Sequence, residues 1–170
     1  FVNINQQDNL VSSFDRTESV VDTLIEVQRF NLFKQANFIG ASASLIKGLD
    51  RSGAARTSDS ISLFSIVENL RDQLLLPIFD IVGLDGGVLI SLYEMGDKRL
   101  EDEPHPLSED GFDADSAYAV VAADALEGFP GNSLVFLDGQ LALISGAPIG
   151  DPDEPIGAII IGTFFDDGFA

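Results

Sequence analysis

Few residues of this sequence are of the types that carry out catalysis. The 170 residues include no cysteine and a single histidine, His105, which lies between Pro104 and Pro106. A histidine in such a loop is more often solvated than catalytic, and thiol chemistry is excluded. The sequence contains no Gly-x-Ser-x-Gly nucleophile motif, no phosphate-binding glycine loop and no histidine or cysteine spacing typical of metal ligands. We therefore expect a protein that is not an enzyme, with no catalytic residue and no cofactor.

Acidic residues gather between Glu94 and Asp115, a segment that holds nine of them. Four acids stand close together there, Glu109, Asp110, Asp113 and Asp115. Carboxylate oxygens at short spacing are ligands that Ca²⁺ prefers. The EF-hand pattern, with its glycine at the sixth position and its acid at the twelfth, is absent. A solvated acidic loop is the simpler interpretation. We expect no metal site and keep a calcium-binding acidic module as an alternative.

The overall charge excludes one large class of partners. The chain has 28 acidic and nine basic residues, a net charge of −19, whereas nucleic-acid binding requires clustered lysine and arginine. The same charge opposes docking on an anionic membrane surface. Hydrophobic residues make up 45% of the chain, which is typical of a globular protein. Its length predicts one domain, residues 1–170.

The first third of the chain has the periodicity of a long helix. No proline interrupts residues 1–76, and we predict a helix from Asn9 to Leu49 that fills an N-terminal segment of residues 1–50. A second, shorter helix should begin near Ser58 or Asp59 and end near Leu75. Apolar residues recur every seven positions along the long helix: Ile25, Leu32, Ile39 and Ile46.

Two hairpins follow in residues 77–170. In the first, Ile78–Leu84 and Val88–Tyr93 flank Asp85-Gly86-Gly87, and Asp-Gly supplies the positive φ angles of a tight turn. The second hairpin repeats this pattern with strands Ser133–Leu137 and Leu141–Ser145. The two short turns predict antiparallel pairing, because parallel neighbours need long crossovers.

One further helix and one further strand complete the predicted order. A helical stretch within Asp113–Leu126 lies between the hairpins, and Ile156–Phe165 is almost wholly apolar. Such a continuous apolar run is typical of a buried strand, so we expect it in the interior of the sheet.

This order of elements resembles that of Cache domains. The resemblance covers nearly the whole chain, and its most specific parts are "DGGVL" (85–89) and the closing "PIGAIIIGTFFDD" (155–167). Cache domains are the PAS-like extracytoplasmic sensor modules of bacterial histidine kinases, chemoreceptors and cyclic-nucleotide enzymes. The resemblance implies an α+β fold in which the long N-terminal helix joins a lobe, residues 77–170, with a five-stranded antiparallel sheet and a crossover helix.

The resemblance also implies a location. In such sensors both ends of the domain lead into membrane spans, and the sequence itself contains no run of roughly 18 apolar residues. We expect a periplasmic or extracellular part of a cell-membrane protein, cut from a longer chain whose transmembrane helices lie outside it.

A small-molecule ligand is the partner that the resemblance implies. In PAS-like sensors the ligand lies between the sheet and the segments that cross it, here residues 93–125. The polar residues able to orient a ligand there are Tyr93, Arg99, Tyr118 and Ser145. With so few basic residues, a monocarboxylate held by Arg99, or a neutral or cationic solute, is easier to accommodate than a polyanion.

Two functions are compatible with these features. The first is a ligand-responsive sensor that passes a signal through its terminal helix and strand to flanking spans, in a homodimer formed by the N-terminal helix. The second is a structural or dimerisation ectodomain whose pocket is filled by its own side chains. A ligand-sized cavity, or stabilisation by a metabolite, would distinguish them.

Overall fold

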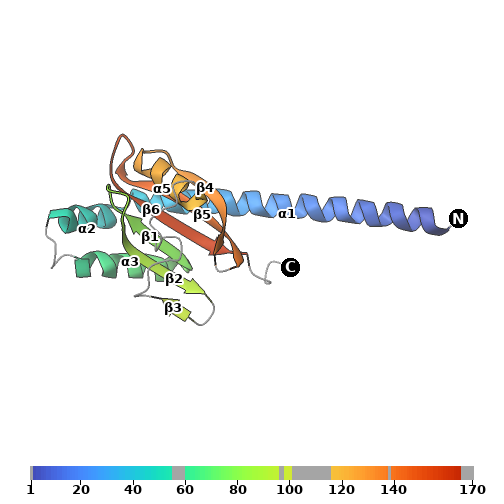
Figure 1. Cartoon of the computed structure of the whole chain (residues 1–170), viewed down its shortest axis with the longest axis horizontal. Helices are drawn as coiled ribbons and strands as arrows, with labels where there is room; N and C mark the ends of the chain where they lie inside the picture. Colours follow the sequence, from blue (N-terminus) through green and yellow to red (C-terminus); the bar gives the residue numbers. More distant parts are fainter. Residues whose placement is uncertain (1, 55–59, 96–97, 101–115, 138, 166–170) are drawn as a thin grey trace. The chain divides into compact units, whose positions relative to one another are not determined.

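The structure, a computed structural model, describes residues 2–54, 60–95, 98–100, 116–137 and 139–165. Side chains are described for residues 19–49, 63–93, 116–137 and 139–165. The chain forms two compact units, Phe1–Asn31 and Leu32–Ala170. The first unit is a stretch of α1, the helix Val2–Gly40, and the second contains all the strands (Figure 1).

The long helix ends earlier than the sequence predicts. α1 stops at Gly40, and a separate helix, α2, spans Ala43–Ala54. The prediction of one helix to Leu49 is therefore wrong. Gly40 packs so closely on the strand β5, Gln140–Asp151, that an added Cβ would collide with the carbonyl oxygen of Pro148. Ser42 then begins α2, since its carbonyl accepts the N–H of Ile46 at 3.0 Å.

The next helix, α3, spans Ser60–Leu74 and confirms the shorter second helix. The N–H of Leu76 donates to the carbonyl of Arg71 at 3.2 Å, and Leu75 has a φ of 52°. A left-handed residue followed by this hydrogen bond is the Schellman ending of a helix. Pro77 comes immediately afterwards and separates the helical part of the chain from the sheet.

The sheet has six strands in the order β3-β2-β1-β6-β5-β4, with antiparallel neighbours throughout. The predicted α+β fold and its five antiparallel strands are confirmed, and the three-residue β3 extends the sheet at one edge. The crossover helix, α5, is also present and joins the two hairpins. The bounds are β1 Ile78–Val82, β2 Val88–Met95, β3 Lys98–Leu100, α5 Ala117–Leu126, β4 Gly131–Leu137, β5 Gln140–Asp151 and β6 Glu154–Phe164.

The apolar strand near the C-terminus lies inside the sheet, as predicted. β6 pairs with β1 on one side and β5 on the other, so that Ile159 lies opposite both Ile81 and Ala147. Residues 157–162 are buried, because helices cover both faces of the sheet. This double coverage explains a continuous apolar run in place of the alternation seen in half-exposed strands.

The strand β5 is twice as long as the sequence suggests. The prediction ended it at Ser145, but it continues to Asp151. Gly146 and Pro148 are residues typical of turns, and here each has another role. Gly146 lies beneath α5, and Pro148 lies beyond the end of β4, where β5 has a partner on one side. A strand tolerates proline at such an edge position.

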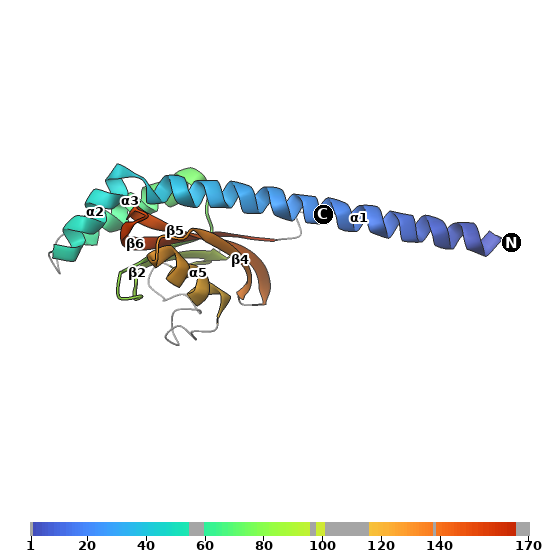
Figure 2. The ribbon, with the colours of Figure 1, turned by 90° about the horizontal axis from the view of Figure 1, so that it is seen from above.

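Helices form a layer on each side of the sheet (Figure 2). The C-terminal part of α1, together with α2 and α3, covers one face, and its core includes Ile39, Leu45, Val67, Phe79 and Ile161. The other face is covered by α5, and its core combines Tyr118, Val121 and Ala125 of that helix with strand residues such as Ile144 and Ile160. We call these the three-helix face and the α5 face.

Candidate functional site

A buried carboxylate distinguishes the α5 face. Asp80 is the third residue of β1, and its exposed fraction is 0%. Its strand neighbours Phe79 and Ile81 belong to the three-helix core, whereas Ile78 and Val82 belong to the core beneath α5. Because side chains alternate along a strand, Asp80 is placed on the α5 face. Among the described side chains it is the one buried acid.

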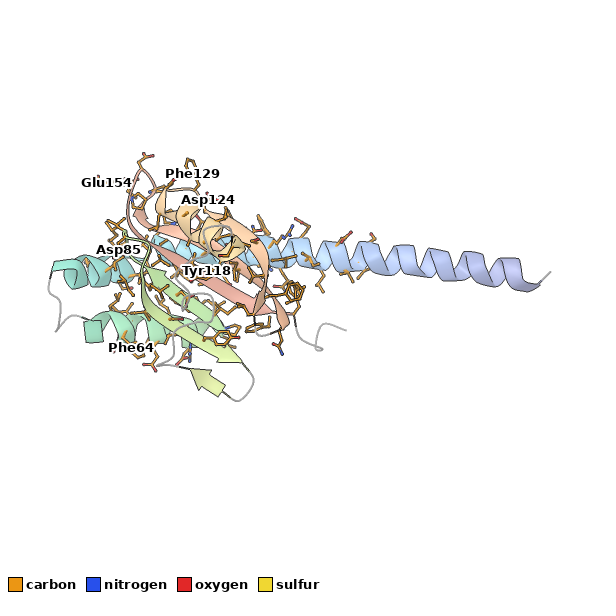
Figure 3. All side chains as sticks on the ribbon, in the orientation of Figure 1. Phe64, Asp85, Tyr118, Asp124, Phe129 and Glu154 are labelled. Carbon is orange, nitrogen blue, oxygen red and sulfur yellow. The ribbon has the colours of Figure 1, made fainter. Side chains whose placement is uncertain are left out.

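Two hydroxyl groups donate to Asp80 from different elements. Ser91, its cross-strand partner on β2, donates from Oγ to Oδ1 at 2.7 Å. Tyr118 of α5, which is labelled in Figure 3, donates from its hydroxyl to Oδ2 at 2.5 Å. Both oxygens of the carboxylate thus receive a proton donor, which offsets part of the cost of removing a charge from water. We call Asp80, Ser91 and Tyr118 the acid cluster.

The position of Tyr118 follows from how α5 begins and packs. Ser116 caps the helix, and its Oγ accepts the N–H of Ala119 at 3.1 Å. Alanines at the buried positions of α5 let the helix approach the sheet closely. Gly146 of β5 makes the same approach possible from the other side, because a Cβ there would lie 2.6 Å from Cγ1 of Val121. The tyrosine ring therefore reaches β1 with 1% of its surface exposed.

Burial raises the pKa of the Tyr118 hydroxyl well above its ordinary value, and the negative charge and hydrogen bond of Asp80 raise it further. Ionising this phenol would create a second negative charge beside the carboxylate in a site that excludes water. Tyr118 is therefore a neutral donor at physiological pH. Tyr118 thus contributes a neutral hydroxyl group to the acid cluster.

An aromatic pair lies next to the acid cluster on the same face. Tyr93 is two residues beyond Ser91 on β2, and its ring meets that of Phe164 on β6 edge to face, with centroids 5.8 Å apart. Two residues along a strand correspond to about 7 Å. The α5 face thus places aromatic surface beside a carboxylate and two hydroxyl groups, a combination suited to a small amphipathic solute.

The structure brings together two of the four predicted ligand-binding residues. Tyr93 and Tyr118 are both buried in the core of the α5 face. On β5, Ile144 belongs to the core of the α5 face, whereas Leu143 and Ala147 belong to the core of the three-helix face. Because side chains alternate along a strand, Ser145 shares the face of Leu143 and Ala147. Its hydroxyl therefore belongs to the three-helix face, where it donates to the carbonyl of Gly131 at 3.0 Å. The expectation that Ser145 ends its strand beside the tyrosines does not agree with this placement.

Arg99 is placed by its backbone alone. It lies in β3 and pairs with Glu94 of β2, and its side chain lies outside the described residues. His105 and most of the acidic segment 94–115 also lie outside them. Within the described part of the chain, no group of three or more acidic or histidine side chains is arranged to hold a metal ion. The hairpin acid Asp151 instead accepts the N–H of Asp153 at 3.0 Å.

Asp80 and Ser91 were not among the predicted site residues. The signal for Asp80 was an acid in the centre of "IFDIV" (78–82), a run otherwise fit for the interior. A charged residue inside such a run is placed in the core by its neighbours and needs a partner there. Ser91 carries no signal of its own, since its role follows from the strand register that sets it opposite Asp80.

Comparison with solved structures identifies the class of fold. The chain superposes on the sensor domain of the histidine kinase DctB of V. cholerae with a TM-score of 0.60 and 13% sequence identity. The match covers 96% of this chain and 57% of that one, so this chain spans little more than half of that sensor domain. This likeness concerns the fold, which the chain shares with that sensor domain over most of its own length. No family model and no curated protein matches the sequence.

None of the described helices combines the length and the apolar character needed to cross a bilayer.

Proposed function

We propose that this chain is the extracytoplasmic sensor domain of a membrane-bound signalling receptor, of the single Cache type. The likeness in fold to a histidine kinase sensor domain over 96% of the chain carries this proposal. The order of elements in the sequence and the "DGGVL" and "PIGAIIIGTFFDD" segments support it independently. The receptor is a histidine kinase, a chemoreceptor or a cyclic-nucleotide enzyme, and the sensor faces the periplasm or the cell exterior.

The ligand of this sensor is a small solute bound between α5 and the sheet. Three observations support this location: the buried carboxylate of Asp80, the hydroxyl groups that donate to it, and the aromatic pair beside them. Buried polar groups are expensive for stability and are retained where they recognise a ligand or specify the fold. Among the described side chains of the three helices on the other side, the buried charged one is Arg71 of α3, which donates to Asp72 of the same helix at 2.8 Å.

The signal leaves the lobe through a homodimer of the N-terminal helix. In the unit Phe1–Asn31, three apolar side chains fall on one stripe of the helix, with exposed fractions of 66% for Val20, 37% for Leu24 and 49% for Val27. Exposed apolar stripes are normally covered by a partner, and a second copy is the economical one. This stripe differs from the predicted one, because Leu32 and Ile39 are buried in the core of the lobe.

Crosslinking tests the dimer in the full-length receptor. The native sequence here has no cysteine, so a single Leu24→Cys substitution reports on one position. We expect Leu24→Cys to form a symmetric disulfide under mild oxidation. Asp22→Cys, which lies on the opposite side of the helix, is the matched control and should remain reduced. Equal crosslinking of the two variants, or none in either, would contradict a helix pair through this stripe.

A ligand-free structural ectodomain is the second candidate. The close packing of α5 on the sheet favours it, since Tyr93 and Tyr118 are each 1% exposed and Val121 fills the space above Gly146. A screen of small metabolites by thermal melting separates the two. A sensor gains stability from its ligand as RT ln(1 + [L]/Kd), whereas a structural ectodomain would be stabilised by no compound.

A further inference from the structure

The two edges of the sheet, β3 and β4, differ in how they are protected (Figure 1). An edge strand presents unpaired backbone N–H and C=O groups, and native proteins guard such groups with short strands, charged residues or proline. β3 has three residues, KRL, and two of them are basic. β4 has seven residues, GNSLVFL, with no charged residue and no proline. The β4 edge thus lacks the protection that the sequence gives to the β3 edge.

Exposed side chains follow the β4 edge on one face of the sheet. Val135 and Leu137 belong to the core of the α5 face, whereas Leu134 packs against the three-helix core. Because side chains alternate along a strand, Asn132 and Phe136 share the face of Leu134. Asn132 is exposed, and Phe136 has an exposed fraction of 72%. Within the described part of the chain β4 pairs with β5 alone, so every second residue directs its backbone groups away from the sheet.

The charge of the chain indicates which partner fits this edge. Two copies that each carry a net charge of −19 repel each other, so they can meet only where acids are absent from the contact. β4 is such a place, because the acids nearest to it in the sequence are Glu127 and Asp138, which flank it on either side. A basic strand of another protein would find no acid within β4 to pair with. The uncharged edge therefore fits a second copy of itself.

We propose that β4 pairs antiparallel with the β4 of a second copy of this chain, about a two-fold axis at Leu134. This register uses all seven residues, since it sets Gly131 opposite Leu137 of the second copy. On the exposed face, Phe136 lies opposite Asn132 of the second copy. It is also diagonal to Leu134 of that copy, within the reach of an aromatic ring. The pair joins two sheets into one and covers the exposed ring.

The association is expected to be weak. Seven residues of a strand span about 23 Å, and one strand pair is smaller than a standard interface of about 1,600 Å². The pairing is also separate from the proposed helix pair, because the stripe of that pair belongs to the unit Phe1–Asn31 and β4 belongs to the unit Leu32–Ala170. It does not depend on the sensory function or on any ligand.

Crosslinking with cysteine tests the register, since the native sequence has none. Residues directly opposite each other in an antiparallel pair have Cα atoms about 4.5–5.5 Å apart, within the range of a disulfide. An equal mixture of Asn132→Cys and Phe136→Cys should therefore form a disulfide-linked dimer. Either variant alone should not, because its two cysteines would lie four residues apart along the strands, about 13 Å.

Sedimentation equilibrium tests the contact itself at protein concentrations up to about 0.5 mM, where a weak interface is populated. Every protein is the full chain with Leu24→Glu, which places a charge in the stripe of the helix pair. Phe136→Glu puts an acid on each side of the seam and should weaken dimerisation about tenfold. Leu84→Glu is the matched control, because it adds the same charge at a residue that is 66% exposed and lies outside β4. It should leave dimerisation unchanged.

Salt gives an independent measurement. Raising the ionic strength screens the repulsion between the acidic copies, so dimerisation should strengthen. Weakening by salt would mean that ionic contacts hold the copies together, which contradicts an uncharged seam.

Each result decides for or against the strand pair. A disulfide in the mixture alone, together with a loss specific to Phe136→Glu, supports it. Disulfides formed equally by either variant alone, or none in the mixture, would overturn the antiparallel register. Equal dimerisation of Phe136→Glu and Leu84→Glu, or a monomer at every concentration before either change is added, would overturn the β4 contact. The sensory function is tested separately by its ligand, so it stands or falls independently of these results.

Discussion

The three-helix face and the α5 face of the sheet are both buried, yet their strands place different chemistry on them. On β1, Phe79 and Ile81 point to the three-helix face and pack among aliphatic side chains. Asp80, between them, points to the α5 face and receives two hydroxyl hydrogen bonds. One strand thus supplies apolar contact to one layer and a charge to the other.

This difference separates stability from recognition. Apolar burial on the three-helix face stabilises the fold without a desolvation penalty. The acid cluster imposes such a penalty, and a sequence that agrees with its fold at every other level usually departs from the rules at a functional site. We therefore expect mutations on the three-helix face to act on stability, and mutations in the acid cluster to act on binding as well.

The largest effect is expected from Phe79→Ala. Phe79 is fully buried in the three-helix core, and truncating a buried phenylalanine typically lowers the free energy of unfolding by about 3–5 kcal/mol. Urea denaturation measures the change. Ligand affinity of the folded fraction should be unchanged, and a loss of affinity in protein that is still folded would contradict the separation of the two faces.

A smaller loss is expected from Gly146→Ala on the α5 face. The added methyl group would meet Cγ1 of Val121 at 2.6 Å and the carbonyl oxygen of Val121 at 3.0 Å. Overpacking of this kind costs about 1–3 kcal/mol. Because α5 must shift to relieve the contact, the Tyr118 hydrogen bond should lengthen as well. An unchanged stability would mean that α5 lies farther from β5 than described.

Two serines, the partly buried Ser91 and the buried Ser145, allow the two faces to be compared. Ser91 donates to Asp80 on the α5 face, and Ser145 donates to a backbone carbonyl on the three-helix face. Ser91→Ala and Ser145→Ala should each lower the free energy of unfolding by about 1 kcal/mol. Calorimetric titration should show weaker ligand binding in Ser91→Ala alone, and weaker binding in Ser145→Ala would restore that residue to the site.

The smallest effect is expected from alkaline pH. The pKa of Tyr118 is raised in the folded state, so the folded chain keeps the phenol proton at pH values where the unfolded chain releases it. The contribution of Tyr118 to stability is complete below about pH 10 and is lost as the pH rises toward the folded pKa. Between pH values of about 9 and 11, the wild type should therefore lose more stability in urea than Tyr118→Phe. Parallel losses would mean that Tyr118 is exposed.

Most of the fold was predictable because it depends on local signals. The Asp85-Gly86 turn predicts a hairpin of β1 and β2, and the apolar run of β6 predicts an interior strand. The structure confirms both predictions. The break at Gly40 was not predictable, since the helical period continues past it and the close approach of Pro148 is a tertiary contact. The extension of β5 was missed for the same reason.

The candidate site was predictable to a lesser degree. Tyr93 and Tyr118 could be named because large polar residues near the crossover helix are few. The acid that the cluster surrounds lies in a strand 38 residues before Tyr118, and no local pattern connects the two. The face that Ser145 takes could not be predicted, because it follows from the register of β5 with β4 and β6.

Fluorine NMR tests most directly whether the α5 face is the ligand face. The chain has two tyrosines, so labelling with 3-fluorotyrosine gives one resonance for Tyr93 and one for Tyr118, and Tyr118→Phe assigns them. We predict that a compound that raises the melting temperature also shifts the Tyr118 resonance, because it binds beneath α5, beside that ring. A stabilising compound that leaves both resonances unchanged at saturation would contradict a ligand site beneath α5.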